Sequence, residues 1–471
     1  HLMDEGERPP VTRARETMLP AVITKIVGWA VAVFYDVERT GPELVSGPVL
    51  VTANHPNALI DPLVIFHTGG RTTRPLAKAP LFEQLFVGTV LKGLGGLPVY
   101  RRQDDPELMH LNDRTFDAAI GALRAGEAVQ IYPEGQSHSE PALTRIRTGA
   151  ARIALMAEDR AEWALGLQIQ PVGLTYTRKH LFRGRAIAAF GLPLSVAPYR
   201  ELYERDPREA ARALTDEIRG RLEALTLNFE HPGDQELVDL AERLWAHDKG
   251  LVKPRDREVM AERLPRLQRF AEGLRWLRQV DPDRLEGLRR DVDRYVGLIK
   301  LLGVQEGDVP SRFRMSSVVR YAFVQLTMLL LVLPVAVVGA AFWALPYYLT
   351  RALVPRFRPK LDQVATYKLS LAILLFPLWI GVIVVILGMT VSWTWSMGAV
   401  LALPLAGLAA VSRRDRGSRV LEAAQIFLRA RRRSRAVDRV TELRRRLVAD
   451  VNDIARRWQE ERRDRRESGA H

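Results

Sequence analysis

Cysteine is absent from all 471 residues of the chain. Disulfide bonds, thiolate metal sites and cysteine nucleophiles are therefore excluded. The nine histidines show none of the spacings typical of metal ligands, so no metal site is expected. The chain also lacks a Gly-x-Ser-x-Gly nucleophile elbow, which argues against a serine hydrolase and against an acyl-enzyme intermediate.

Charged residues are missing from two long stretches in the second half of the chain. Residues 321–350 are 30 uncharged positions, and residues 369–411 are 43. The second stretch is long enough for two membrane spans of ~20 residues each, and the MTVSWTWSMG segment between them suits a turn at the membrane interface. Neither stretch contains an Asp, Glu, Lys, Arg or His residue that would mark a transport pathway, which argues against a transporter.

The first uncharged stretch has basic residues on both sides, so a full crossing would place one basic cluster on the wrong side of the membrane. Pro334 and Gly339 bracket its midpoint, where a hairpin would bend. We therefore expect residues 321–350 to form a re-entrant hairpin with both ends cytoplasmic. A single tilted span is the alternative. The whole membrane region is predicted over residues 311–411.

The charge of the chain is strongly positive, with a formal net charge of +14 and a pI near 10.2, which favours an anionic partner. Residues 412–471 carry 19 arginines against 10 acidic residues and follow the apolar region directly. A basic segment beside a membrane is typical of an anchor for anionic lipids, and nucleic acid is not expected as a partner. The three-four spacing of apolar residues predicts an amphipathic helical tail that lies on the membrane or pairs with another helix, and a homodimer is left open.

The first half of the chain divides into three parts. Residues 1–47 are expected to form an interfacial membrane helix and a lead-in, because their apolar run is short and interrupted by Lys25. Residues 48–200 alternate short apolar runs with helical stretches, which is the α/β pattern. Residues 201–310 are charged, leucine-rich helices, which we expect to pack on the preceding domain.

A histidine follows the apolar run VLVTA and has an aspartate close behind it. On one continuous helix, six residues advance ~600°, so His55 and Asp61 could not meet. A bend at Pro56-Asn57 would bring them together, with Asn57 as the cap of the next helix. A carboxylate on one ring nitrogen would make His55 a general base, although a hydrogen-bonded histidine at a strand end is the alternative.

Three further segments end in turns or lie in apolar runs. The segment from Gly95 to Arg102 places two guanidinium groups after a tight turn, which suits phosphate. The segment from Ile131 to Ser137 ends in a carboxylate and a hydroxyl, and Arg147 precedes a helix whose start favours an anion. Pro171 lies in an apolar strand, suited to a sheet edge or a channel wall. Taken singly, each is equally typical of an ordinary turn or strand.

The segment with His55 and Asp61 is the first of four, and the three segments above follow it in chain order. Together the four resemble the glycerolipid acyltransferase family, which includes glycerol-3-phosphate and lysophosphatidate acyltransferases. The resemblance covers roughly residues 20–200. One feature departs from the family pattern: five residues separate His55 from Asp61, where the family usually has four. The His-Pro-Asn form is similar to a branch of the family that contains glycerol-3-phosphate and dihydroxyacetone-phosphate acyltransferases.

The resemblance implies an α/β acyltransferase domain, a sheet flanked by helices, and an enzyme of phospholipid synthesis. From the charge and apolar patterns above, we expect a helical segment and C-terminal transmembrane or re-entrant helices to follow, in a cell-membrane protein with its catalytic domain and tail on the cytoplasmic side. The acyl donor would be a thioester of coenzyme A or acyl carrier protein, with no other cofactor. The expected acceptor is glycerol 3-phosphate or dihydroxyacetone phosphate. Lysophosphatidate or another lysophospholipid is the alternative, and an inactive membrane scaffold is a further one.

The resemblance also assigns roles to individual residues. His55 would be the general base and Asp61 would hold its ring. The residues expected to bind the acceptor phosphate are Arg101, Arg102 and Arg147. The residues expected to line the acceptor pocket are Asn54, Gly95, Pro98, Glu134, Gly135 and Ser137. Pro171 is expected near the path of the acyl chain.

Overall fold

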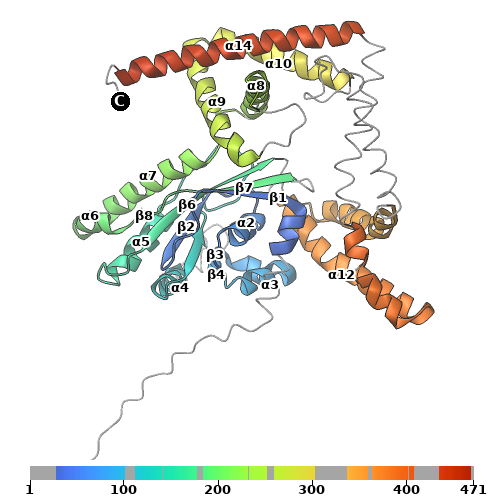
Figure 1. The fold of residues 1–471 in the computed structure, drawn as a ribbon. Helices are drawn as coiled ribbons and strands as arrows, with labels where there is room; N and C mark the ends of the chain where they lie inside the picture. The colour runs from blue at the N-terminus through green and yellow to red at the C-terminus, as the bar shows by residue number, and fades with distance from the viewer. Residues whose placement is uncertain are drawn as a thin grey trace, which may run out of the picture.

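The computed structural model of the chain contains a mixed β-sheet, a bundle of charged helices and a group of apolar helices (Figure 1). The described residues are 28–100, 112–140, 142–177, 184–231, 233–251, 259–302, 337–358, 363–400, 402–407 and 434–467. Within them the sheet has eight strands in the order β1-β7-β6-β2-β5-β3-β4, with β8 beside β6. The strands are β1 (Tyr35–Thr40), β2 (Val49–Ala53), β3 (Thr73–Lys78), β4 (Leu97–Val99), β5 (Ala128–Ile131), β6 (Gln168–Thr177), β7 (Gly184–Phe190) and β8 (Leu194–Ser195).

The centre of the sheet is parallel. Strands β2 to β6 all run in one direction, whereas β7 is antiparallel to β6 and β1 is parallel to β7. This sheet, flanked by helices, confirms the predicted α/β fold. Strand β1 belongs to the sheet although it lies within residues 1–47, so the sheet begins before residue 48, the predicted start of the domain.

Alternate residues of the strands face opposite layers, as the two-residue period of a strand requires. In β2, Val49 and Val51 face one apolar cluster and Leu50 faces the other. The first face is covered by residues 28–34, α2 (Ile60–Thr68) and α3 (Leu85–Gly93). The second face is covered by α4 (Asn112–Arg124), α5 (Gly149–Asp159) and α7 (Pro207–Leu225). Because α7 covers the sheet, the domain extends beyond residue 200.

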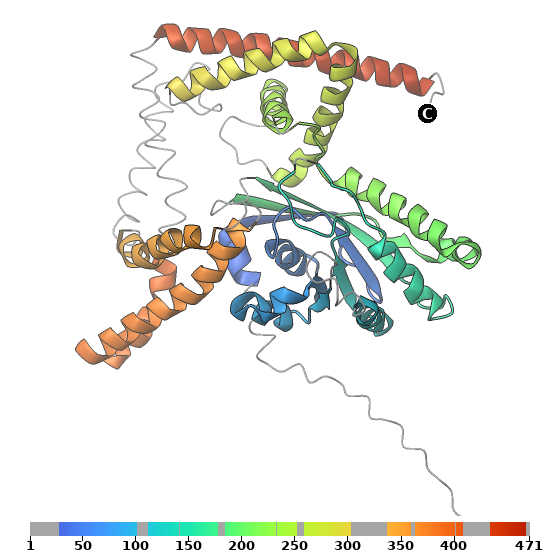
Figure 2. The same cartoon turned by 180° about the vertical axis from the view of Figure 1, so that it is seen from behind.

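The C-terminal tail forms a long helix that packs on three charged helices of its own chain. These four helices are α8 (Asp234–Asp248), α9 (Met260–Val280), α10 (Pro282–Leu302) and α14 (Ser434–Glu467) (Figures 1 and 2). Val440, Leu447 and Val451 of α14 are buried in the apolar cluster that these helices share. Arg284 of α10 also forms an ion pair with Asp453 of α14 at 2.9 Å. The sequence predicted that the apolar stripe of the tail lies on the membrane or pairs with another helix. The structure shows the second, with helices of the same chain.

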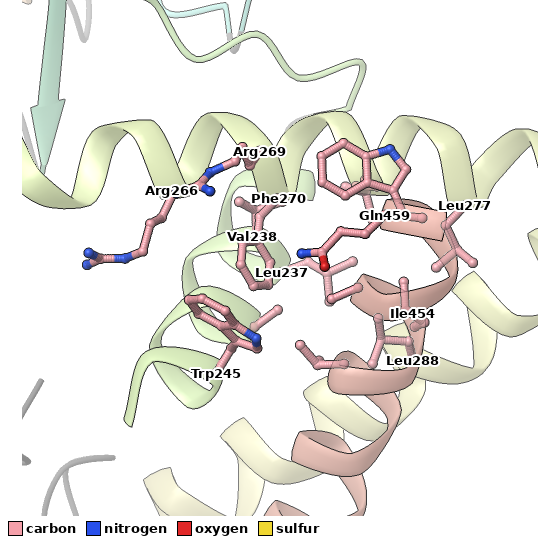
Figure 3. A pocket seen from close by; sticks show the side chains of 16 residues that line it. Leu237, Val238, Trp245, Arg266, Arg269, Phe270, Leu277, Leu288, Ile454 and Gln459 are labelled. Carbon is pink, nitrogen blue, oxygen red and sulfur yellow. The ribbon is translucent and has the colours of Figure 1, made fainter. Parts of the chain in front are cut away.

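A cavity of about 80 Å³ lies between α8, α9, α10 and α14, and its wall is mainly apolar, with Trp245 and Phe270 among the side chains (Figure 3). Its charged or amide side chains, all within the described helices, are Arg266, Arg269 and Gln459. The lining therefore contains no histidine or carboxylate that could act as a general base.

Two described helices are long and apolar enough to cross a membrane: Val337–Phe357 and α12 (Val364–Thr390). The first turns of α12 lie against the sheet domain, where Ala365 and Leu369 are buried in the same cluster as α2. Further along α12, Leu374 and Leu378 are exposed. Figure 2 shows this helix leading away from the sheet.

The structure changes one detail of the predicted hairpin over residues 321–350. Gly339 lies inside a helix rather than at a bend, and it is packed so closely that a Cβ atom would lie 2.3 Å from the carbonyl oxygen of Ala406. Close helix packing therefore explains this glycine. Pro334 lies outside the described residues, so the hairpin itself stays a prediction. Helix α12 ends at Thr390, within the segment predicted to turn.

Candidate active site

Polar side chains gather where β2, β5 and β6 end. These strands are parallel neighbours, so their carboxyl ends lie at one edge of the sheet. His55 follows β2, Glu134 follows β5 and Tyr176 lies near the end of β6. The carboxyl edge of a parallel sheet is where α/β proteins commonly bind ligands.

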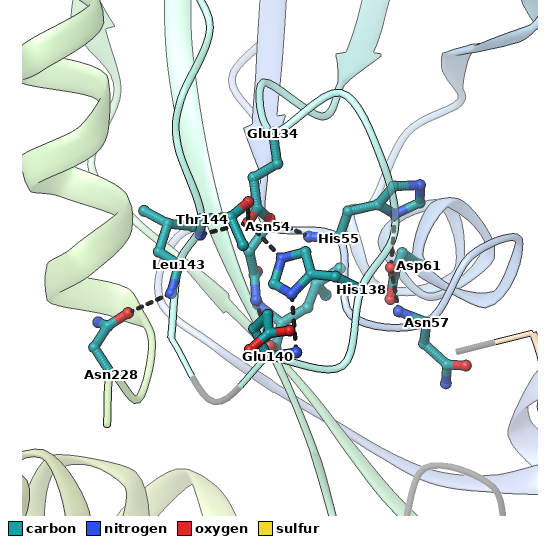
Figure 4. Close-up of polar contacts among 11 residues, drawn as sticks. Asn54, His55, Asn57, Asp61, Glu134, His138, Glu140, Leu143, Thr144 and Asn228 are labelled. Atoms are coloured by element: carbon teal, nitrogen blue, oxygen red, sulfur yellow. Dashed lines mark hydrogen bonds and ion pairs between the residues drawn. The ribbon is translucent and has the colours of Figure 1, made fainter. Parts of the chain in front are cut away.

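His55 and Asp61 are in direct contact, as the sequence predicted (Figure 4). The Nδ1 atom of His55 lies 2.8 Å from Oδ2 of Asp61, which is fully buried, whereas the His55 side chain is 18% exposed. An N–H group at Nδ1 donates to the carboxylate, which leaves Nε2 as the acceptor nitrogen of the neutral ring. Within the described residues, no side chain or backbone group hydrogen-bonds Nε2.

The bend that joins these residues differs from the predicted one. Ala58 has a φ of 41°, in the left-handed region, and α2 begins two residues later with Leu59 as its N-cap. Asn57 does not cap the helix: its side chain donates to the hydroxyl of Tyr35 at 2.9 Å. The reversal at Ala58 allows Asp61 to sit in the first turn of α2 and point back at His55.

The buried carboxylate of Asp61 is held by three donors. Besides His55, the backbone N–H of Asn57 donates to Oδ2 at 2.8 Å, and the hydroxyl of Tyr176 donates to Oδ1 at 2.7 Å. A buried charge is costly unless hydrogen bonds satisfy it. These donors therefore keep Asp61 in place with its Oδ2 atom directed at the imidazole.

The ring of His55 is held from a second direction by Tyr132 at the end of β5. The two rings are stacked, with centroids 4.1 Å apart and an interplanar angle of 20°. Burial is the main factor that raises the pKa of Tyr132, so this phenol stays neutral. Stacking on one face and a hydrogen bond at Nδ1 together fix the direction of Nε2.

Glu134 is a buried hub behind His55. Its Oε1 atom accepts the backbone N–H of His55 at 2.8 Å. Its Oε2 atom accepts from Nε2 of His138 at 2.5 Å and from the N–H and hydroxyl of Thr144 at 2.8 and 2.6 Å (Figure 4). Burial alone would raise the pKa of Glu134, but the hydrogen bonds from His138 and Thr144 outweigh it and lower the pKa below its usual value.

Comparison with known proteins now places this site in a family. Residues 36–175, which contain His55, Asp61, Tyr132 and Glu134, match the Acyltransferase family model. These residues form an acyltransferase domain. Glycerol-3-phosphate O-acyltransferase 2 of Saccharomyces cerevisiae is 33% identical over 135 residues, covering 28% of this chain and 18% of that protein. An uncharacterized acyltransferase of Schizosaccharomyces pombe is 25% identical over 278 residues, covering 41% of this chain and 40% of that protein.

The chain is also similar to a solved structure, that of the 1-acyl-sn-glycerophosphate (LPA) acyltransferase PlsC of Thermotoga maritima. It shares 19% sequence identity at a TM-score of 0.32, over 45% of this chain and 83% of that one. The chain spans less than half the length of the two curated relatives, at 18% and 40%.

Two predicted pocket residues of the acyltransferase domain, Asn54 and Glu134, are held by the protein around the site. Both oxygens of Glu134 are bound by the protein, and its side chain is fully buried. Asn54 is also engaged, because its amide pairs with the backbone N–H and carbonyl of Leu174 at 2.7 and 2.9 Å. These two residues therefore fix the strand ends around His55 and are not free to bind an acceptor in this conformation.

Gly135 and Arg147 remain beside the site. Gly135 has a φ of 77°, and a Cβ atom there would lie 3.1 Å from Nε of Arg147, whose side chain is exposed. The backbone N–H of Arg147 donates to the carbonyl of Pro133 at 2.8 Å, which fixes this arginine over the turn. Ser137 belongs to the same loop and is half-buried.

The structure does not bring Gly95 to the site. Gly95 precedes β4, so it lies toward the amino end of a strand whose carboxyl end points to the His55 edge. Its φ of 66° and the hydrogen bond of its carbonyl with Nε of Arg74 make it a turn residue. Pro98 lies within β4, where its carbonyl accepts the hydroxyl of Thr115 at 2.8 Å. Arg101 and Arg102 follow β4 but lie outside the described residues.

Pro171 is buried inside the sheet, so the edge-strand prediction is wrong: β6 runs between β2 and β7. The strand tolerates a proline there because its antiparallel partners pair with residues on either side of it. Strand β8 pairs with Gln168 and Ile169, and β7 pairs from Val172 onward. No ladder donor is therefore needed at Pro171.

Sequence reasoning missed the aromatic and polar side chains around the dyad. The missed residues are Tyr35, Tyr132, His138, Thr144 and Tyr176, and Asn57 was predicted only as a helix cap. A signal exists for the tyrosines, because a buried tyrosine hydroxyl usually has a hydrogen-bond partner and all three lie in or next to apolar strands. Which partner each one takes depends on how distant strands pair.

Proposed function

We propose that the chain is a membrane-bound O-acyltransferase that moves a fatty acyl group from an acyl thioester to glycerol 3-phosphate or dihydroxyacetone phosphate, with His55 as general base. The observation that carries this proposal is the 2.8 Å contact between Nδ1 of His55 and the buried Asp61, within a domain of the acyltransferase family. A histidine held in this way presents the other ring nitrogen as a base.

In the proposed reaction, Nε2 of His55 takes the proton of the acceptor hydroxyl as its oxygen attacks the thioester carbonyl carbon. The C–S bond then breaks, and the thiolate that leaves takes a proton from the imidazolium. An ester and a thiol result. Asp61 stabilises the imidazolium between these two transfers, and general-base catalysis of this kind contributes typically ~10²–10⁴ in rate.

An anionic acceptor is supported by one described basic residue beside the site, Arg147. Arg147 is exposed over the turn at Gly135, next to the hub at Glu134. Arg101 and Arg102, the other two predicted phosphate ligands, lie outside the described residues. A guanidinium fork suits phosphate oxygens. The His-Pro-Asn form and the names of the Saccharomyces cerevisiae relatives favour glycerol 3-phosphate over a lysophospholipid.

Membrane attachment is supported by Val337–Phe357 and α12, which are apolar and expose large hydrophobic side chains. The start of α12 packs on the acyltransferase domain through Ala365 and Leu369, so the domain would lie at the membrane surface. We place the domain and α14 on the cytoplasmic side, where the exposed arginines of α14 would meet anionic lipids.

The decisive test is acyl transfer by the purified full-length chain in detergent. Labelled acyl-CoA or acyl-loaded carrier protein would be offered with glycerol 3-phosphate, dihydroxyacetone phosphate or lysophosphatidate. We expect product with a glycerol phosphate acceptor and a loss of ~10²–10⁴-fold in kcat for His55→Ala. The matched control is His67→Ala, an exposed histidine on α2, which should retain wild-type activity.

Each outcome of this assay distinguishes the proposed function from one alternative. Product from lysophosphatidate alone would overturn the acceptor assignment and make the chain a lysophospholipid acyltransferase. Activity that survives His55→Ala would overturn the general-base assignment. Absence of product with every donor and acceptor would favour a scaffold role.

A further inference from the structure

Tyr176 contacts the oxygen of Asp61 that faces away from His55. Its hydroxyl donates to Oδ1 at 2.7 Å, whereas His55 and the backbone of Asn57 bind Oδ2. Tyr176 comes from β6, 115 residues after Asp61 in the chain, so the contact exists only because β6 pairs beside β2. Tyr176 therefore binds one oxygen of the buried Asp61 carboxylate, and His55 binds the other.

The Tyr176 hydroxyl is a neutral donor throughout the working pH range. Burial is the largest factor that raises the pKa of Tyr176, and the neighbouring charge of Asp61 raises it further. A hydroxyl that donates to a carboxylate in a dry site withdraws part of its negative charge. The strength with which Asp61 supports a positive charge on His55 therefore depends on this donor.

We propose that Tyr176 is a positioning residue that, through Asp61, sets the pH at which His55 becomes a base. The proposal deepens the proposed function and rests on its assignment of His55. With the donor present, Asp61 is a weaker acceptor for the Nδ1–H of His55. Without it, Asp61 would stabilise the imidazolium more strongly, and a higher pH would be needed to free Nε2.

The surroundings of the pair supply few competing charges. Within the described residues, the ionisable groups in direct contact with this cluster are Tyr35 of β1, Tyr132 and Glu134 from β5 and its turn, His138 of the following loop and Tyr176 of β6. Arg147 is the cation beside the site, exposed over the turn at Gly135. Glu134 reaches His55 through the backbone N–H, and its other oxygen is bound by His138 and Thr144. Of the tyrosines, Tyr176 alone hydrogen-bonds Asp61 among these described groups.

Tyr35 provides a matched control. Its ring contacts that of Tyr176, with centroids 5.6 Å apart, and it is equally part of the buried cluster. Its hydroxyl accepts from the side chain of Asn57 rather than binding Asp61. Tyr35→Phe therefore removes a buried hydroxyl from the same cluster and leaves both oxygens of Asp61 with their donors.

The test is the pH dependence of kcat/KM, together with a direct titration of His55. We expect Tyr176→Phe to move the acidic limb of the profile to higher pH by about half a unit to one unit, and Tyr35→Phe to leave it in place. The ¹³C-labelled imidazole resonance of His55, assigned by its loss in His55→Ala, should show the same shift by NMR. A role in packing alone would lower the rate at all pH values without moving the limb.

Three results would overturn the inference. The first is an unchanged His55 titration in Tyr176→Phe, the second is an equal shift in Tyr35→Phe, and the third concerns a background without the Asp61 carboxylate. In an Asp61→Asn background, Tyr176→Phe should add no further shift, and an added shift would mean that Tyr176 acts by another route. The NMR titration needs no turnover, so it still tests Tyr176 if the assay with His55→Ala overturns the general-base assignment.

Discussion

At the scale of single residues, the candidate site depends on buried groups that never meet solvent. Glu134 links the backbone of His55 to the side chains of His138 and Thr144, and its own side chain is fully buried. The motif Glu-Gly-Gln-Ser suggested a pocket wall, because a sequence motif does not reveal which way a carboxylate points. In the structure, Glu134 instead accepts the backbone N–H of His55 and so holds the loop that contains His55.

Glu134→Gln tests this task through stability. The amide would place an N–H₂ group where Oε2 now accepts hydrogen bonds from His138 and Thr144, so we expect the free energy of unfolding to fall by about 2 kcal/mol at neutral pH. The matched control is Glu140→Gln. The side chain of Glu140 is exposed, so this substitution should change the free energy of unfolding little.

The pH dependence of the Glu134→Gln effect follows from the lowered pKa of Glu134, whose usual value is 4.5. A carboxyl group with a lowered pKa in the folded state stabilises the fold above its unfolded pKa, and this stabilisation is lost as pH falls through the folded pKa. The difference in Tm between the wild type and Glu134→Gln should therefore be constant above pH 4.5 and narrow below it. Thermal unfolding of both proteins in detergent, at pH values above and below 4.5, measures this difference in Tm. A difference in Tm that stays constant at all pH values would contradict the prediction that Glu134 is ionised in the folded protein.

At the scale of secondary-structure elements, the connection from β2 to α2 brings the dyad together. The two residues are six positions apart, and the chain reverses between them at Ala58, which has a φ of 41°. The sequence indicated a bend but favoured Pro56 and Asn57, because proline and asparagine are common in turns. The side chain of Asn57 instead donates a hydrogen bond to Tyr35 of β1, a partner that local sequence does not reveal.

Substitutions at Ala58 test the bend. A left-handed conformation costs roughly 1–2 kcal/mol for a residue with a Cβ atom, and more for a β-branched one. Ala58→Gly should therefore fold at least as stably as the wild type and keep its activity, whereas Ala58→Val should lower both Tm and kcat. Thermal unfolding and the acyl-transfer assay measure these effects. Equal behaviour of the two variants would mean that the connection relaxes to another conformation.

At the scale of the whole molecule, the chain joins an acyltransferase domain to apolar helices on one side and a charged bundle on the other (Figure 1). Helix α12 has 27 residues and begins against the domain core. At ~1.5 Å per residue it exceeds the ~30 Å thickness of a bilayer core. If α12 crosses a membrane, its start lies on the side of the domain and its end lies on the other side.

Cysteine labelling tests this topology without background, because the chain contains no cysteine. We expect Glu201→Cys in the domain, Gln363→Cys before α12 and Ser418→Cys beyond the apolar region to react from the same side of the membrane. Val391→Cys, exposed just after α12, should react only from the other side. Reaction of Val391→Cys from the same side as Glu201→Cys would exclude a crossing by α12. Opposite sides for Gln363→Cys and Ser418→Cys would exclude the two-span hairpin.

The sequence by itself determined the features that arise from short-range pattern. The alternation of apolar strands and helices identified the α/β fold, and the uncharged stretches identified the apolar helices, because periodicity and length are local properties. It also identified His55 and Asp61, since one connection joins them. Tertiary structure alone decided the rest: the donor from Tyr176 to Asp61, the partners of Glu134, the placement of Gly95 away from the site, and the packing of α14 on α8, α9 and α10. These contacts depend on strand order and helix packing between segments distant in the chain, which no local pattern encodes.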